Sequence, residues 1–363
     1  MPRRAGWGFR LLVALIVQAC LAMLQRPLDA RPARRELPDR LTNQEFWRLS
    51  SALSEQDGTF RSDNLVSNEV WFQYVIPDLL RAVPPAGVYL GVGPEQNFTY
   101  IAALKPAMAF VIDVRRANLD LQLMYKALFE TSPNRVEFVS RLFSRPRPGG
   151  ISERSTASEI FEAFSHVEHS QPLYEETLRL IKQQLLDRHK FTLSTGEWLA
   201  IASTLEAFST FGPNIHYLST GTDTYGGARL PTYAELMTAT DEGGVAHSYL
   251  NTEEDFRWLR DLEGRNLIVP VVGNFVGPKA IRAVGSYLKD RGATASTFYL
   301  SNVEMYLERE MTWGTFCRNV AALPLDARSV FIRSAFDGRY GHGYGLNSDL
   351  GPLLPRVDRC PPS

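Results

Sequence analysis

The sequence predicts an α/β protein with a doubly wound, mostly parallel sheet and a helical insertion. Short apolar runs such as "GVYLG" and "MAFVID" alternate with helical segments near both ends of the chain. That alternation is typical of parallel sheets with helices on both faces. A glycine turn, "GVGPEQN", follows the first apolar run, and the middle of the chain has mainly helical periodicity.

The N-terminal segment differs from the rest of the chain. Arg3, Arg4 and Arg10 precede a largely apolar run over residues 11–24. A basic start and an apolar run of this length have the form of a signal peptide and are short for a membrane span. We therefore expect residues 1–24 to be a signal peptide or anchor.

Residues 25–40 are rich in proline and arginine, which predicts a disordered tether. The protein is then expected to be exported or membrane-associated on the periplasmic side, with the membrane contacted only through the N-terminal segment. "VQAC" resembles a lipobox, in which Cys20 would be acylated. A translation start at Met23 would instead make the protein cytoplasmic.

Residues 41–145 are predicted to hold N-terminal helices and the first half of the sheet. Thr42 and Glu45 form a capping-box pattern that starts a helix. The expected elements that follow are strands at 88–91 and 108–113, helices at 97–104 and 116–130, and a third strand at 134–140.

Residues 146–265 are predicted to be a mainly helical insertion, opened by the proline- and glycine-rich linker 144–159. Residues 266–363 return to the βα pattern and complete the sheet. Strands are expected at 266–275, 296–302 and 328–336, followed by a glycine-rich C-terminal loop.

The glycine turn at the end of the first strand predicts a ligand site. Gly91 and Gly93 permit a tight turn and a close approach of backbone N–H groups to a ligand. Asp113 ends the second strand, where a carboxylate commonly accepts hydrogen bonds from ribose hydroxyls. Gln96 stands where a dinucleotide site needs a third glycine, which disfavours NAD and FAD.

The stretch "YLGVGPEQN" resembles motif I of class I S-adenosylmethionine (SAM) methyltransferases. This resemblance implies a Rossmann-like, methyltransferase-type fold and SAM as cofactor, with Gly91, Gly93, Pro94 and Asp113 beside it. The sequence departs from the family at Tyr89, where an acid is usual, and at Glu95, where a third glycine is usual.

Other residues complete the cofactor site that this resemblance implies. Glu95 either meets the ammonium group of the ligand or blocks its place. Asn97 starts the following helix, and Asn274 in "VVGNF" ends a strand where this family presents residues to the methyl group. The chain is also similar to a group of uncharacterised bacterial proteins that share "SDNLVSNE", "GVGPEQNFTYIA" and "SNVEMYL".

Two further groups of polar residues are candidates for a lid or a substrate contact. The segment "SDNLVSNE" either caps the helix that follows or covers the cofactor, as an N-terminal segment often does in this family. Ser301 and Asn302 in "YLSN" end another predicted strand at the same edge of the sheet. The candidates are Asp63, Asn64, Asn68, Glu69, Ser301 and Asn302.

Composition and missing motifs exclude several classes of protein. Lys and Arg (39) nearly balance Asp and Glu (40), so no nucleic-acid surface is indicated. There is no G-x-S-x-G elbow and no phosphate-binding P-loop motif. His166 and His169 lack matching ligands, so no metal site is predicted. Cys317 and Cys360 are compatible with either a disulfide or free thiols.

Three functions remain open from the sequence. The first is a SAM-binding, methyltransferase-like protein that takes a small-molecule ligand and transfers a methyl group to an unidentified acceptor. The second is an exported or membrane-tethered binding protein with a degenerate cofactor site. The third is a dinucleotide-dependent oxidoreductase, against which Gln96 argues.

Overall fold

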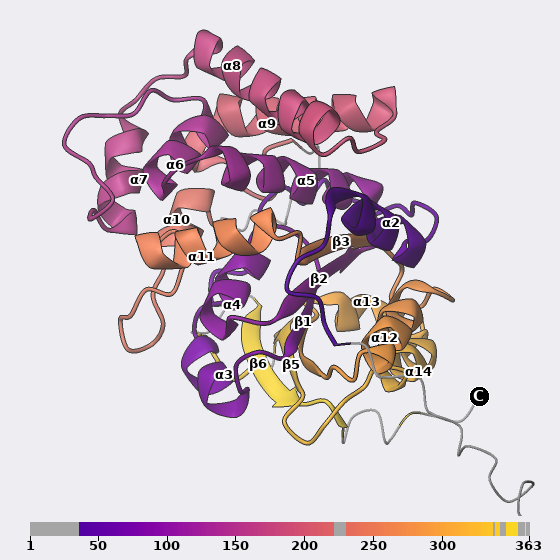
Figure 1. The fold of residues 1–363 in the computed structure, drawn as a ribbon. Helices are drawn as coiled ribbons and strands as arrows, with labels where there is room; N and C mark the ends of the chain where they lie inside the picture. Colours follow the sequence, from indigo (N-terminus) through magenta and orange to yellow (C-terminus); the bar gives the residue numbers. More distant parts are fainter. Residues whose placement is uncertain (1–35, 221–229, 337, 342–345, 355–359, 361–363) are drawn as a thin grey trace, which may run out of the picture. The chain divides into compact units, whose positions relative to one another are not determined.

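A computed structural model describes residues 36–220, 230–336, 338–341, 346–354 and 360. Within these residues the chain forms one six-stranded sheet in the order β3-β2-β1-β4-β5-β6 (Figure 1). All neighbouring strands are parallel except β5 and β6, which are antiparallel. The strands are β1 (Val88–Gly91), β2 (Met108–Asp113), β3 (Ile268–Val272), β4 (Ala295–Tyr299), β5 (Val330–Ala335) and β6 (Asn347–Pro352).

Helices flank the sheet, with α4 and α12 on opposite sides of it in Figure 1. In the described chain they are α2 (Asn43–Leu53), α3 (Ile76–Ala82), α4 (Gln96–Leu104), α5 (Arg116–Thr131), α6 (Arg135–Phe143), α7 (Ala157–Ser165), α8 (Gln171–Lys182), the π-helix η1 (Gln183–Arg188), α9 (Thr195–Phe211), the 3-10 helix η2 (Gly212–Asn214), α10 (Tyr233–Thr238), α11 (Glu253–Gly264), α12 (Ala280–Asp290), α13 (Val303–Arg309) and α14 (Trp313–Ala321). The prediction of an α/β fold with a mostly parallel sheet is confirmed.

Strands β1 to β4 are buried along their whole length, which explains why their sequences are largely continuous apolar runs. All residues of β1, β2, β3 and β4 are buried. Gly91 pairs with Val111, and Asp113 pairs with Val272. The carboxyl ends of these strands therefore meet at one edge of the sheet, where ligands bind in open α/β folds.

Helices are the regular elements in the described residues between β2 and β3. Helices α9 and α11 pack against α5, which itself lies on β2 and β3. Aromatic rings join these layers: the ring centroid of Phe129 lies 4.7 Å from that of Phe138 and 5.5 Å from that of Phe256. The insertion therefore shares the core of the sheet domain.

The prediction of a third strand at 134–140 is wrong, because these residues begin α6. The side chain of Asn134 caps this helix by accepting a hydrogen bond of 2.9 Å from the backbone N–H of Glu137. Val136 and Phe138 suggested strand alternation, but Val139, Leu142 and Phe143 complete a buried helical face. Short apolar runs do not distinguish a strand from a buried helix.

The prediction that the C-terminal segment after residue 336 is only a loop is also wrong, since it contains β6. This strand lies at the edge of the sheet, antiparallel to β5. Asp349 on β6 pairs with Arg333 on β5 at 2.7 Å. Unlike β3 at the opposite edge, on which α2 and α5 pack, β6 is only partly buried and carries polar residues and glycine, so it lacks the apolar run of β1 to β4.

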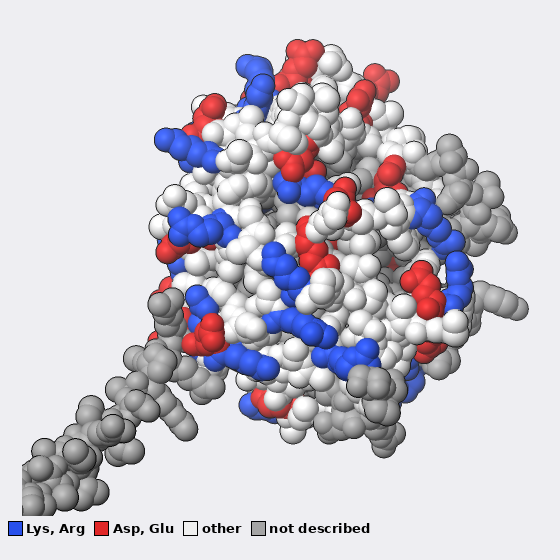
Figure 2. Space-filling view, turned by 90° about the vertical axis from the view of Figure 1, so that its right-hand side faces the viewer, with Lys and Arg blue, Asp and Glu red and all other residues white. Residues whose placement is uncertain are grey.

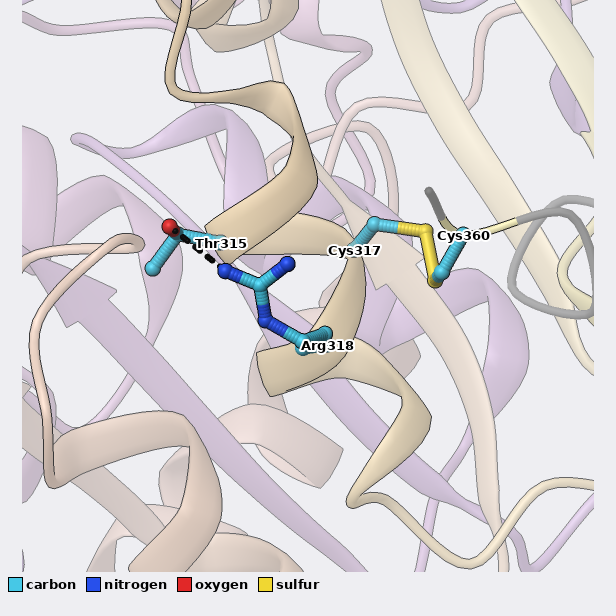
Figure 3. Close-up of a disulfide and its surroundings, with 4 residues drawn as sticks. All are labelled: Thr315, Cys317, Arg318 and Cys360. Carbon is cyan, nitrogen blue, oxygen red and sulfur yellow. Dashed lines mark hydrogen bonds between the residues drawn. A yellow bond between two sulfur atoms is a disulfide. The ribbon is translucent and has the colours of Figure 1, made fainter. Parts of the chain in front are cut away.

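A disulfide joins Cys317 on α14 to Cys360, 43 residues later in the sequence (Figure 3). The next residue on the helix, Arg318, donates a hydrogen bond of 3.1 Å to the hydroxyl of Thr315. The Cys317 side chain is buried against the core. Residue 360 is therefore fastened covalently to the helix that follows α13.

The predictions for residues 1–24 and for most of 25–40 concern residues outside the described chain. In the described part, no helix combines the length and the apolar character that a membrane span requires. The surface in Figure 2 carries basic and acidic side chains interspersed on the face shown. That mixture agrees with the nearly balanced composition of the chain.

Candidate functional site

A cavity of about 190 Å³ lies at the carboxyl ends of β1, β2, β3 and β4. Its wall combines the glycine turn, the segment after α2, the residues that follow β2 and β3, Tyr217 three residues beyond η2, and the start of α13. The lining residues are Thr59, Phe60, Asn64, Ser67, Asn68, Val92, Gly93, Gln96, Asp113, Val114, Arg115, Tyr217, Gly273, Asn274, Phe275, Ser301, Asn302, Val303, Tyr306, Leu307 and Glu310. This is the edge of the sheet that the sequence predicted for a ligand.

The glycine turn after β1 is held in shape by Asn97. Gly93 has φ +80°, a conformation that favours glycine. The Asn97 amide donates hydrogen bonds to the carbonyls of Val92 at 2.9 Å, Gly93 at 3.2 Å and Pro94 at 2.8 Å. Its side-chain oxygen accepts a bond of 2.9 Å from the hydroxyl of Tyr89. Tyr89 and Asn97 therefore shape the turn from behind the cavity wall.

Replacing Asn97 by alanine should lower the free energy of unfolding by about 2–4 kcal/mol, because buried carbonyls and one hydroxyl lose their partner. Chemical denaturation of the purified variant measures this change. Asn214→Ala is the matched control, because Asn214 is exposed, and it should change the value by less than about 0.5 kcal/mol. Equal losses in the two variants would contradict the bracing role of Asn97.

Asp113 and Arg115 form a buried ion pair on the cavity wall. Arg115 Nε lies 3.1 Å from Asp113 Oδ1, and another guanidinium nitrogen lies 3.2 Å from Oδ2. The backbone N–H of Arg115 also donates to Oδ1, at 2.9 Å. The third guanidinium nitrogen donates to the carbonyl oxygens of Ser62 and Asp63. Arg115 thus links the end of β2 to the segment 62–69.

Glu95 lies behind the glycine turn, outside the cavity wall. Its carboxyl is fully buried and accepts a hydrogen bond of 3.1 Å from the backbone N–H of Ser67. Burial raises the pKa of Glu95 to about 8, an effect that the bond from Ser67 opposes and the nearby Glu69 increases. At neutral pH the side chain is therefore largely an uncharged acid that fastens segment 62–69 to the turn.

Glu69 is the centre of a buried cluster of hydroxyl groups at the ends of β4 and β5. Its carboxylate accepts hydrogen bonds from Ser301, from Ser334 and from Tyr299, the last at 2.8 Å. Tyr299 in turn accepts a bond of 2.8 Å from the amide of Gln96. Burial raises the pKa of Glu69, while the three hydroxyl donors lower it. Ser301 and Gln96 connect this cluster to the cavity wall.

The segment after α2 crosses the strand ends and closes one side of the cavity. The backbone N–H of Glu55 donates a hydrogen bond of 2.8 Å to the carbonyl of Val272. The N–H of Gly58 donates one of 2.9 Å to the carbonyl of Val114. The ring of Phe60 then meets the ring of Tyr306 on α13, edge to face, with centroids 5.4 Å apart.

The carboxylate of Glu55 accepts hydrogen bonds from the backbone N–H groups of Lys279 and Ala280 at the start of α12, at 2.7 and 2.6 Å. A third bond comes from the N–H of Asn274, at 3.3 Å. A carboxylate at this end of a helix is favoured by the helix dipole. Glu55 thereby fixes the backbone of Asn274 at the rim of the cavity.

The structure divides the residues predicted from the sequence into two groups. Those on the cavity wall are Gly93, Asn64, Asn68, Asp113, Asn274, Ser301 and Asn302; those that do not line it are Gly91, Pro94, Glu95, Asn97, Asp63 and Glu69. Sequence reasoning missed Gln96 as a wall residue, together with Arg115, Phe60, Tyr217 and Tyr306. Arg115 follows Asp113 by two residues, so its position after a predicted strand end was a usable signal.

No group of three or more His, Cys, Asp or Glu side chains in the described residues is arranged to hold a metal ion. His166 lies on the surface and contacts Glu162 at 3.1 Å. The cavity at the strand ends is lined by polar side chains and aromatic rings.

The fold and the cavity define an α/β protein with a cavity at the carboxyl edge of its parallel strands. The chain belongs to the family described as "Domain of unknown function (DUF7790)", whose model matches residues 64–349. The match begins at Asn64 on the cavity wall and ends within β6. Comparison with curated proteins gave no match.

Proposed function

We propose that the protein binds S-adenosylmethionine in this cavity and is a methyltransferase-like protein of Rossmann-like fold. The observation that carries the proposal is the chemistry of the cavity wall. Arg115 is the only cationic side chain among the described residues that line the cavity, and its donors are occupied by Asp113 and two backbone carbonyls. A phosphate-bearing nucleotide would find no free cation there, whereas SAM carries no phosphate.

The size of the cavity argues against a dinucleotide. Its volume of about 190 Å³ lies below the roughly 300–1,000 Å³ of sites for drug-sized ligands. A dinucleotide, which is larger than a single nucleoside, therefore fits less well than SAM. Gln96 also occupies the position at which a dinucleotide site needs a glycine.

The hydrogen-bonding capacity of Asp113 supports a ribose contact. An ionised carboxylate offers about four acceptor positions. Arg115 uses two of them on Oδ1 and one on Oδ2. One position on Oδ2 remains for a ribose hydroxyl, and Asp113 lines the cavity. The residues present therefore fit the group that the sequence resemblance implies.

In this proposal SAM supplies an electrophilic methyl group, and the protein positions it. Gly93 lets the ligand approach the backbone, and the N-terminus of α4 favours its carboxylate. Phe60, Tyr217, Phe275 and Tyr306 supply ring surfaces. Contacts of this kind hold two reacting groups within about 3–3.5 Å of each other. In such a displacement, this positioning supplies most of the rate gain.

The disulfide favours a second candidate function, an exported binding protein. Structural disulfides persist in oxidising compartments, and Cys317 and Cys360 are joined. Together with the signal-like residues 1–24, this supports export, whereas SAM is a cytosolic metabolite. N-terminal sequencing of the natural protein tests this candidate: cleavage near residue 24 supports export, and a start at Met1 or Met23 contradicts it.

Calorimetric titration with SAM and S-adenosylhomocysteine tests the leading proposal. Residues 36–363 form one compact unit and are the protein to use, with the disulfide intact. We expect binding of both ligands, and at least tenfold weaker binding by Asp113→Ala, since a hydrogen bond to a charged group contributes about 1.5–3 kcal/mol. The absence of both heat and thermal stabilisation at millimolar ligand would exclude the proposal. A dissociation constant of that size corresponds to only about 4 kcal/mol of binding free energy.

A further inference from the structure

The hydrogen bond from Ser301 to Glu69 determines whether the Ser301 hydroxyl can donate or accept toward the cavity. Ser301 lines the cavity and donates that proton in a hydrogen bond to Glu69. A serine hydroxyl has one O–H donor and two acceptor lone pairs. Toward the cavity, Ser301 therefore presents only acceptor capacity. Its φ of 51° is rare for a residue other than glycine, and such conformations cluster at functional sites.

Behind Ser301 lies a group able to take up a proton. The Glu69 carboxylate is 2% exposed and accepts from three hydroxyl groups. Burial raises its pKa, so that it is a stronger base than an exposed carboxylate. The side-chain oxygen of Gln96 adds a second acceptor on the same wall, because it is buried and has no hydrogen-bond partner.

We infer that Ser301 and Glu69 form a proton-accepting pair for the methyl acceptor, which is therefore a hydroxyl or amine compound. The inference rests on the proposed function. Ser301 contacts the reacting group, and Glu69 acts through Ser301 as a positioning residue and final base. Substrates whose reacting atom carries no proton, such as thioethers, gain nothing from this pair.

The transfer balances in atoms and charge. A new bond forms between the acceptor oxygen or nitrogen and the methyl carbon, and the carbon–sulfur bond breaks with its electron pair left on sulfur. The acceptor gives its proton to the Oγ atom of Ser301. Ser301 gives its own proton to Glu69, which becomes a neutral carboxylic acid.

The test compares sinefungin with S-adenosylhomocysteine by calorimetry on residues 36–363. Sinefungin carries an amino group where SAM carries the transferred methyl, so it places a hydrogen-bond donor where the acceptor would react. We expect the wild-type protein to bind sinefungin roughly 10-fold to 100-fold more tightly than S-adenosylhomocysteine, because hydrogen bonds to charged groups contribute about 1.5–3 kcal/mol. Ser301→Ala and Glu69→Gln should bring the affinity ratio close to one.

Ser296→Ala is the matched control, because Ser296 lies on β4, the strand that precedes Ser301, and its hydroxyl donates to the carbonyl of Val88 outside the cavity wall. It should keep the wild-type ratio. An unchanged ratio in Ser301→Ala would overturn the inference while the proposed function stands. Failure of both ligands to bind wild type would overturn both. A substitution that weakens both ligands equally leaves the ratio of their affinities unchanged. If Glu69→Gln does not fold, Ser301→Ala alone tests the inference.

Discussion

Replacing Arg115 by alanine should lower the free energy of unfolding by about 3–5 kcal/mol, the cost of leaving one partner of a buried ion pair uncompensated. The Asp113 carboxylate would lose two side-chain hydrogen bonds, and the carbonyls of Ser62 and Asp63 would lose their donor. Segment 62–69 would then be held less firmly over the cavity. Urea denaturation followed by circular dichroism measures the change.

The double variant Asp113→Ala/Arg115→Ala distinguishes an uncompensated charge from a simple loss of packing. It should be more stable than Arg115→Ala alone, because no unpaired carboxylate remains. Arg48→Ala is the exposed control, since Arg48 lies on the solvent face of α2, and it should change stability by less than about 0.5 kcal/mol. A double variant less stable than Arg115→Ala would show that the ion pair is not the source of the loss.

The region around β1 was predictable because its signals are local. Residues 88–91 and 108–113 were predicted as strands and are β1 and β2. Both are buried at every residue, so their composition alone marks them as central parallel strands. Helix α6 was missed although its cap, Asn134 followed by Glu137, stood in the sequence. The apolar run of α6 is compatible with a strand or a buried helix, whereas the capping signal at Asn134 correctly indicates the start of a helix.

Only those wall residues of the cavity that lie at the ends of strands could be predicted from the sequence. Asp113, Asn274 and Ser301 follow three different strands and reach the same wall, as the topology requires. The inward positions of Glu95 and Glu69 were not predictable, because their partners are distant in sequence. Glu95 binds Ser67, 28 residues earlier, and Glu69 binds Ser301, 232 residues later. No local pattern encodes contacts of that range.

Glu95 does not line the cavity, and its buried acid has a consequence for stability. Its pKa is 4.5 in its ordinary state and about 8 in the folded protein. Below pH 4.5 both the folded and the unfolded states keep the proton. Between pH 4.5 and about 8 only the unfolded chain releases it, so rising pH favours unfolding by up to about 1.4 kcal/mol per pH unit. Above pH 8 this contribution is constant.

Glu95→Gln should remove that dependence, because a glutamine has no proton to release. Denaturation midpoints at pH 5, 6, 7 and 8 measure it, and the stability of the variant relative to wild type should rise across this range. Glu263→Gln is the matched variant, because burial raises the pKa of Glu263 to about 8 against the opposing effect of Lys126, at a site away from the cavity. It should show a rise of the same sign, and the double variant a larger one. A difference for Glu95→Gln that stays level with pH would show that the Glu95 carboxyl is ionised in the folded protein, and that a charged group fastens segment 62–69 to the glycine turn.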